Sequence, residues 1–440
     1  MIAPACQWAG LPLRQASADW ELAMRVRRLQ LTDYRNFPRL DLSLPGGPVA
    51  IVGRNAQGKS NLLEAVYLLS TMRSARADSD GELIRRQAGQ VAGVPPLARL
   101  VAEVEGRCGP LRLEMAIVAR SGDLDPLAAR PAGVPRANKL VRVNGVARRL
   151  ADAVGQLNAV LFTAHDMEVI DGPPSLRRRY LDITISQVDG GYLRALQRYA
   201  KVLLQRNHLL KRVQEGRARP EELAFWSQEL VREGSYIVQA RALTVASLGP
   251  LAAAAHAALT EGQEELALVY QPQLGRAIDG HQAASLSQAE LAAAFAQVIA
   301  RWGEREIGAG ASLLGPHRDD LLFHLGGISA ATFASRAQER TIALALRLAE
   351  ARYLLARRGE SPVLLLDDVL SELDGRRRTA VLAAVADYEQ VLVTATDLDR
   401  FSAGFLEGAT IFQVASGSLE AMAAAAGAET GQASSGEPSP

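Results

Sequence analysis

The 440-residue sequence has few cysteines, few aromatic residues and no long run of strongly hydrophobic residues. Its two cysteines, Cys6 and Cys108, exclude a disulfide framework and a four-ligand zinc site, and fit a reducing, cytoplasmic compartment. The most apolar stretch, residues 245–259, is mostly alanine and short for a membrane span, so we expect no membrane segment. The net charge is only +1, so a nucleic-acid partner must be sought in local clusters of charge.

The composition that remains is that of a globular protein, with 48% apolar and 22% charged residues. Strand-like runs dominate residues 24–175, helical periodicity takes over in residues 176–308, and strands alternate with helices again in residues 309–417. We therefore expect an α/β head domain divided into two sequence segments, with a mainly helical arm domain between them. Residues 1–23 are expected to be an extension of doubtful order, and residues 418–440, which are small and polar, a disordered tail.

One motif makes a specific chemical prediction. Residues 53–60, GRNAQGKS, match the phosphate-binding pattern Gly-x-x-x-x-Gly-Lys-Ser between an apolar strand and a helix. In such a loop, backbone N–H groups and the helix start bind phosphate oxygens, the lysine reaches the β and γ phosphates, and the serine holds Mg²⁺. The predicted ATP-binding residues are Gly53, Arg54, Asn55, Ala56, Gln57, Gly58, Lys59, Ser60 and Asn61.

A second apolar run, PVLLLDD at residues 362–368, is typical of a buried parallel strand and ends in two carboxylates. Ligands bind beyond the carboxyl ends of such strands. We therefore expect Asp367 to hold Mg²⁺ through water, and Asp368 to act with Lys59 in catalysis by orienting or deprotonating the attacking water. The alternative is a pair of solvated loop carboxylates. Asp367 lies 308 residues after Lys59, and this long separation indicates a head of the ABC-type P-loop ATPase class.

Cassette ATPases carry a signature helix shortly before this strand, and a helix that starts at Ser335 takes that position. In isolation Ser335 is an ordinary helix cap. In the cassette interpretation, the helix start points at the γ-phosphate bound by another subunit, so ATP lies between two heads. The signature residues expected to act in trans are Ser335, Arg336, Ala337 and Gln338. A loop that crosses the dimer interface is expected at Ser371, Glu372, Leu373 and Asp374, and a phosphate sensor at Thr394 or Thr396, with ordinary loops as the alternative.

Positive charge is concentrated in residues 171–219, which contain eleven lysines and arginines but only four acidic residues. Five of these cations fall near one helical face: Arg194, Arg198, Lys201, Lys211 and Arg212. DNA phosphates attract such a face without base selectivity. The alternative, of about equal weight, is a solvated helix whose arginines pair with acidic residues elsewhere.

Together these motifs resemble the RecF family of bacterial recombination-mediator ATPases. The resemblance covers residues 24–417 and also includes LTDYRNF at residues 31–37, DGPPSLRRRYLD at residues 171–182 and LLGPHRDDL at residues 313–321. It implies a weak, DNA-stimulated ATPase that acts as a switch. ATP would drive a homodimer that binds duplex DNA and single-strand/duplex junctions, and that works with RecR, RecO and RecA in DNA replication and recombinational repair.

The family signature usually reads Ser-x-Gly-Gln, whereas Ala337 stands at its third position here. Because glycine lets the backbone approach a phosphate closely, Ala337 predicts looser ATP-driven dimerisation. Other classes compete with this interpretation, namely the ATPase subunit of a membrane transporter, an SMC-like ATPase and a nuclease fused to an ATPase. A signature without Gly-Gly disfavours the transporter subunit. The sequence lacks the long heptad repeats that the arms of an SMC-like ATPase need, and it lacks the acidic metal cluster that a nuclease needs.

Overall fold

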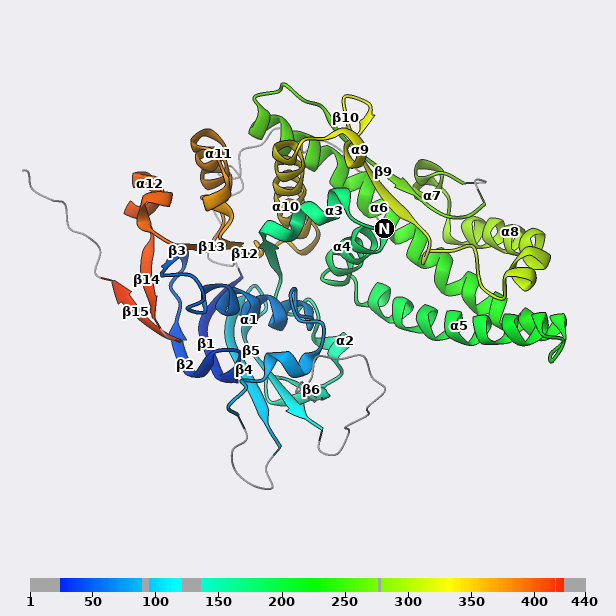
Figure 1. Cartoon of the computed structure of the whole chain (residues 1–440), viewed down its shortest axis with the longest axis horizontal. Coiled ribbons are helices and arrows are strands. Elements are labelled where there is room, and N and C mark those ends of the chain that lie inside the picture. The colour runs from blue at the N-terminus through cyan, green and yellow to red at the C-terminus, as the bar shows by residue number, and fades with distance from the viewer. Residues whose placement is uncertain (1–23, 89–94, 121–135, 276–277, 416, 423–440) are drawn as a thin grey trace, which may run out of the picture.

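The computed structural model describes residues 24–88, 95–120, 136–275, 278–415 and 417–422 (Figure 1). The expected N-terminal extension, residues 1–23, lies outside the described residues. The described strands form two six-stranded sheets and one three-stranded sheet.

The first six-stranded sheet is mostly parallel and has the order β15-β14-β3-β13-β12-β8. Its strands come from both ends of the chain: β3 (Gly47–Val52), β8 (Ala159–Phe162), β12 (Val363–Asp367), β13 (Gln390–Ala395), β14 (Thr410–Ala415) and β15 (Ser418–Met422). Side chains alternate between two cores, so Val49 and Ile51 pack with α1 (Lys59–Thr71), whereas Ala50 and Val52 belong to the core that contains α10 (Arg336–Arg358). Because both faces of the sheet centre are covered, β8, β12 and β13 are buried along almost their whole length, as the sequence predicted for residues 362–368.

The second six-stranded sheet is antiparallel, with the order β2-β1-β4-β5-β6-β7. Its strands are β1 (Arg25–Tyr34), β2 (Phe37–Ser43), β4 (Leu97–Gly106), β5 (Gly109–Ala119), β6 (Ala137–Val143) and β7 (Val146–Arg148). One face packs against α1, and the other carries exposed polar residues such as Arg28, Asp41 and Arg99. Helix α1 is therefore enclosed between the two sheets, which explains why nearly all of its residues are buried.

The helices of residues 174–309 that have more than ten residues lie together on one side of the molecule (Figure 1). They are α4 (Pro174–Ser186), α5 (Gly190–Gln214), α6 (Leu223–Thr260) and α8 (Gln288–Ala309). One helical stretch, Pro220–Thr260, is long and apolar enough by length and composition to cross a membrane, and 44% of its apolar window is buried inside the protein. Helix α6 packs against α5, α8 and α10, so it is the central core helix of this region.

Short elements complete the described chain. They are η3 (Asp80–Leu83), α2 (Leu150–Ala153), η4 (Ala164–Met167), α3 (Glu168–Asp171), η5 (Pro220–Glu222), β9 (Leu266–Gln271), α7 (Gly280–Ser285), β10 (Asp320–Leu325), β11 (Ile328–Ser329), α9 (Ala330–Phe333), η6 (Val369–Glu372), α11 (Gly375–Val385), η7 (Leu398–Arg400) and α12 (Ala403–Glu407).

A buried ion pair between Arg241 and Asp319 joins the predicted arm to the segment that follows it. The Arg241 guanidinium of α6 donates to Asp182 of α4 at 2.9 Å and to Asp319 at 3.0 Å. Asp319 is fully buried and also accepts from the backbone N–H of Gln273 at 2.8 Å. Removing one partner would leave a buried charge uncompensated, which is strongly destabilising. The conspicuous GPHRDD sequence at residues 315–320 therefore has a structural role at this junction.

Two features differ from the sequence expectations. Residues 418–422 were expected to be disordered, but Ser418–Met422 forms β15 and pairs antiparallel with β14. Gly417 makes the turn at φ +80°, and β15 has mostly exposed side chains, so no hydrophobic pattern marks it. The rest of the expected tail, residues 423–440, lies outside the described residues. In addition, β10 pairs with β9 and with β11, so one small sheet spans the predicted boundary between residues 308 and 309.

Candidate nucleotide-binding site

The phosphate-binding loop connects β3 to α1, and its backbone needs glycine at both ends. Gly53 and Gly58 have φ values of +155° and +113°. A Cβ at Gly53 would lie 2.5 Å from the carbonyl oxygen of Val414, and one at Gly58 would lie 2.5 Å from Nδ2 of Asn36. Close packing against β14 and against the β1–β2 turn therefore fixes the path of the loop.

Lys59 is the first residue of α1 and is buried. Its ammonium group donates to the carbonyl oxygens of Gly53 and of Arg54, the latter at 3.1 Å, so it lies within the curve of its own loop. Burial lowers the pKa of Lys59 below its ordinary value, while the carboxylates of Asp368, Asp367 and Asp397 act in the opposite direction. The lysine of the loop, the predicted metal ligand Asp367 and the predicted catalytic residue Asp368 therefore share one electrostatic environment.

The strand order explains how this happens. β13 lies between β3 and β12, and all three strands are parallel, so their carboxyl ends meet at one edge. In the register of the sheet, Asp367 of β12 lies beside Thr394 of β13, which in turn lies beside Ile51 of β3. Lys59 and Asp367 are 308 positions apart in the sequence, but only β13 separates the strand that leads to Lys59 from the strand that ends in Asp367.

Thr394 holds the two carboxylate residues in place. Its hydroxyl accepts from the backbone N–H of Asp368 at 2.9 Å and lies 3.1 Å from Oδ1 of Asp367. Thr394 is fully buried beneath the site, whereas Thr396 follows the end of β13 and is half-buried. Of the two candidate phosphate sensors, Thr396 is therefore the one at the open edge, and Thr394 supports the carboxylates from below.

Asp368 has two unusual properties. Its φ is +53°, a left-handed conformation that few non-glycine residues adopt, and such conformations cluster at functional sites. Its Oδ1 atom is buried and accepts no hydrogen bond from any residue that the structure describes. A buried acceptor of this kind is costly unless a donor satisfies it. A water molecule poised beside a bound phosphate, or one held by Mg²⁺, is a suitable donor, so the site fits a magnesium nucleotide.

Three residues at this site were missed from sequence. Asp397 follows the end of β13, and its carboxylate raises the pKa of Lys59, against the effect of burial. Arg76 lies between α1 and η3, with Nη1 3.8 Å from Oδ2 of Asp367. Asn36 donates to the carbonyl of Gln57 at 2.9 Å and accepts from Nδ2 of Asn61 at 2.8 Å. The position of Asp397 after an apolar strand, like that of Asp367, was the signal that could have found it.

The predicted signature forms the exposed start of α10. Ser335 is the N-cap and forms a capping box with Gln338, in which each side chain bonds the other residue's backbone N–H. Ser335, Arg336 and Ala337 are exposed. No described contact joins these residues to the phosphate-binding loop of the same chain, so the structure does not bring the two motifs together within one molecule.

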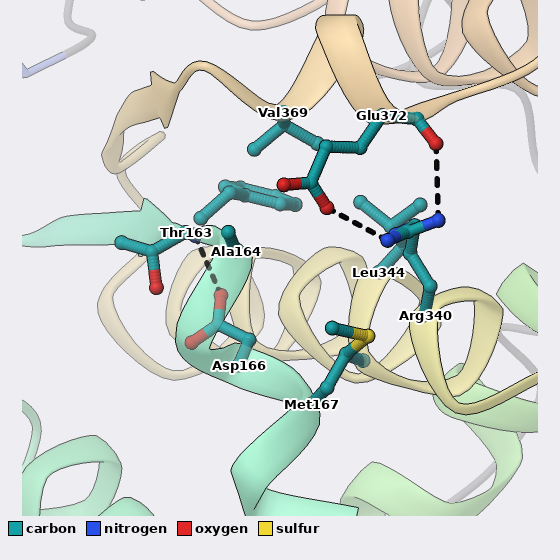
Figure 2. Close-up of a pocket in the computed structure, with 10 residues that line it drawn as sticks. Thr163, Ala164, Asp166, Met167, Arg340, Leu344, Val369 and Glu372 are labelled. Atoms are coloured by element: carbon teal, nitrogen blue, oxygen red, sulfur yellow. Dashed lines mark hydrogen bonds and ion pairs between the residues drawn. The ribbon is translucent and has the colours of Figure 1, made fainter. Parts of the chain in front are cut away.

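The predicted dimer loop begins directly at the carboxylates. The Ser371 hydroxyl donates to the carbonyl of Asp368 at 2.8 Å, and Asp374 caps α11 by accepting from the N–H of Arg377 at 2.9 Å. Leu373 is buried. Figure 2 shows Glu372 above a small pocket, where its carboxylate pairs with Arg340 of α10 at 2.8 Å. The dimer loop and the signature helix of one chain are therefore joined by an ion pair.

The predicted DNA-binding face on α5 is only partly free of acidic partners. Arg198 pairs with Glu233 at 2.8 Å, and Arg194 lies 4.0 Å from Asp152. Lys201, Lys211 and Arg212 are exposed and have no acidic partner among the described residues. The alternative of a helix paired with acids elsewhere thus holds for Arg198, while the other end of α5 keeps its positive charge.

Comparison with known proteins places this geometry in a family. A family model described as RecF/RecN/SMC N terminal domain matches residues 25–417. The chain is similar to the DNA replication and repair protein RecF of Chloroflexus aurantiacus, with 45% identity over 404 residues that cover 90% of this chain and 99% of that protein. The protein of the same description from Roseiflexus castenholzii is 43% identical over 402 residues, covering 90% of this chain and 99% of that protein.

Solved structures are also similar to this chain. A structure described as the recombination mediator protein RecF-ATP in the RecFOR pathway is 27% identical, with a TM-score of 0.77 over 91% of this chain and 98% of that one. The Smc head domain with an extended coiled coil from Pyrococcus furiosus has a TM-score of 0.50 at 15% identity, over 91% of this chain and 96% of that one. The second likeness concerns the fold alone.

Proposed function

The chain belongs to the RecF family within the RecF/RecN/SMC class, and from this premise we propose that it is an ATP-driven switch that binds DNA in replication and recombinational repair. The observation that carries the proposal is the shared edge of the parallel sheet, where Thr394 bonds both Asp367 and Asp368 beside the strand that leads to Lys59. The ATP-bound state of a solved relative supports ATP as the ligand.

In the proposed ATPase, residues 53–61 surround the phosphates with backbone N–H groups, and Lys59 neutralises the β and γ phosphates. Ser60 and Asp367 would hold Mg²⁺, which would offset the phosphate charge that builds up during transfer. Asp368 accepts a hydrogen bond from the attacking water through its unpartnered oxygen. Thr396, which is half-buried and follows β13 at the open edge of the sheet, is the proposed sensor of the γ-phosphate.

Hydrolysis is proposed to require two chains. The exposed residues Ser335, Arg336 and Ala337 have no role within their own chain's nucleotide site, and their helix start is suited to bind a phosphate. We infer that they contact ATP bound by a second copy, with residues 371–374 crossing the interface. The ion pair between Glu372 and Arg340 would then couple the two contact elements of each chain.

DNA is the proposed partner of the assembled dimer, with duplex DNA and single-strand/duplex junctions as targets. The exposed cations Lys201, Lys211 and Arg212 support contacts to backbone phosphates rather than to bases. The pathway named for the solved relative supports RecR and RecO as partners. The resemblance to the family adds RecA as the recombinase that is loaded downstream.

The decisive experiment is analytical ultracentrifugation of the full chain with ATP and Mg²⁺, with and without a gapped duplex. We expect ATP to convert monomer into dimer, and the dimer to sediment with the DNA. A chain that stays monomeric while it hydrolyses ATP would contradict the two-chain site. A dimer that does not bind DNA would contradict the DNA-binding role but not the ATP-driven dimerisation.

A further inference from the structure

Among the residues that the structure describes, one hydrogen bond joins the arm to the predicted signature. The turn between α6 and β9 carries Glu264, whose Oε1 accepts from Nε2 of Gln338 at 2.7 Å. Gln338 is the last residue of the signature, and its own Oε1 accepts from the backbone N–H of Ser335 at 2.8 Å. A single amide group thus connects the arm to the start of α10.

These two bonds fix the orientation of the Gln338 amide. An ionised carboxylate has no proton to donate, so Glu264 can face only the NH₂ end of the amide. The amide oxygen is then directed to Ser335, as the capping box requires. Without Glu264, the amide could turn, and its NH₂ group would oppose the N–H of Ser335.

The surroundings of Glu264 favour this single arrangement. Its side chain is 29% exposed, and its Oε2 lies 3.5 Å from Nε2 of His256, which is fully buried in α6. Gln338 is half-buried, in contrast to the three exposed signature residues before it. The same turn also lies near α11, since Oε1 of Glu261 is 3.9 Å from Nη1 of Arg376. The contact is therefore part of the packing of the arm against α10, which carries the signature, and against α11, which follows the dimer loop.

We propose that Glu264 is a positioning residue for the signature, which holds Gln338 and through it Ser335 in the geometry that binds the ATP of a second copy of the chain. This role rests on the proposed two-chain site. It gives the arm a direct connection to nucleotide binding in trans, because a shift of the α6–β9 turn changes the hydrogen bonding of the signature. It predicts no role for Glu264 in binding ATP within its own chain.

The test compares three variants of the full chain. Glu264→Ala removes the acceptor, Glu264→Gln keeps an acceptor oxygen, and Glu265→Ala removes the neighbouring carboxylate, which is exposed and has no side-chain partner among the described residues. Sedimentation with ATP and Mg²⁺ measures dimerisation, and fluorescence titration with a labelled ATP measures binding to the single chain. We expect Glu264→Ala to weaken dimerisation about tenfold, as the loss of one charge-assisted hydrogen bond does.

The controls separate positioning from folding. Glu265→Ala should dimerise as the unaltered chain does. Glu264→Gln should lose less than Glu264→Ala, because its side-chain amide still has an acceptor oxygen but can also turn its NH₂ group toward Gln338. All three variants should bind labelled ATP with unchanged affinity. Undiminished dimerisation of Glu264→Ala would overturn the proposal, as would an equal loss in Glu264→Gln, because a role through charge alone does not require the amide orientation. If the unaltered chain fails to dimerise with ATP, the two-chain site itself is wrong and this role is wrong with it.

Discussion

The two halves of the proposed ATP site differ in how the chain holds them. The half made of the phosphate-binding loop and the carboxylates is embedded at the edge of a buried sheet, and Lys59 and Thr394 are both buried there. The other half, the start of α10, is exposed at Ser335, Arg336 and Ala337. The first half is fixed by backbone packing around glycines and strands, whereas the second depends on a cap and on a neighbouring carboxylate.

Because of this difference, we expect the two halves to control different steps, namely nucleotide binding and hydrolysis on one side and association of two chains on the other. Substitutions in the buried half should change nucleotide binding or hydrolysis in a single chain. Substitutions in the exposed half should leave that binding intact and change only the association of two chains.

The largest effect is expected for Asp368→Asn in the buried half. An amide cannot accept the water proton as a carboxylate does, so we expect the rate of hydrolysis to fall about a hundredfold or more. ATP binding and dimerisation should persist, which traps the dimer. Phosphate release and sedimentation measure the two properties, with exposed Asp387→Asn as the control. A variant that loses ATP binding instead would show that Asp368 shapes the binding site.

Lys59→Met should nearly abolish nucleotide binding. It removes a charged donor to the phosphates, worth about 3 kcal/mol or roughly a hundredfold in Kd. Titration with labelled ATP measures the loss, and Lys211→Met on the exposed arm should have no such effect. Normal ATP binding by Lys59→Met would refute the assignment of the loop.

Ser335→Arg should block ATP-driven dimerisation, because a long cation replaces the cap at the interface. Loss of a cap alone costs about 1 kcal/mol of stability. Ser287, the N-cap of α8, forms the same capping box and provides the control variant Ser287→Arg. Thermal unfolding should shift similarly in both variants, while sedimentation should detect the loss of the dimer in Ser335→Arg alone. Equal dimerisation of the two variants would place the signature outside the interface.

Ala337→Gly should have the smallest effect, a few-fold gain in ATP-dependent dimer affinity. Glycine allows closer approach of a phosphate, although it lowers helix stability by about 1 kcal/mol. Ala289 holds the same second helical position in α8 and is exposed, so Ala289→Gly matches the stability cost. Sedimentation at several protein concentrations compares the two. An unchanged affinity in Ala337→Gly would show that the methyl group is not the limit on dimerisation.

Much of the fold could be predicted because its signals are local. The strand at residues 362–368 and the loop at residues 53–60 were predicted from short patterns, and the structure contains both as expected. β15 was missed because an exposed edge strand shows no hydrophobic pattern. On α5, the sequence could not decide whether Arg198 is free, since its partner Glu233 belongs to another helix.

The phosphate-binding loop could be recognised from the sequence alone, because its two glycines, Lys59 and Ser60 stand at a fixed local spacing between an apolar strand and a helix. Only the tertiary structure decided that β13 lies between β3 and β12, which brings Asp367 and Asp368 to Lys59 and places Thr394 beneath them. It also decided that Glu264 of the arm meets Gln338. Strand order and helix packing depend on contacts between segments that are distant in the chain, and no local pattern specifies which distant segment is the partner.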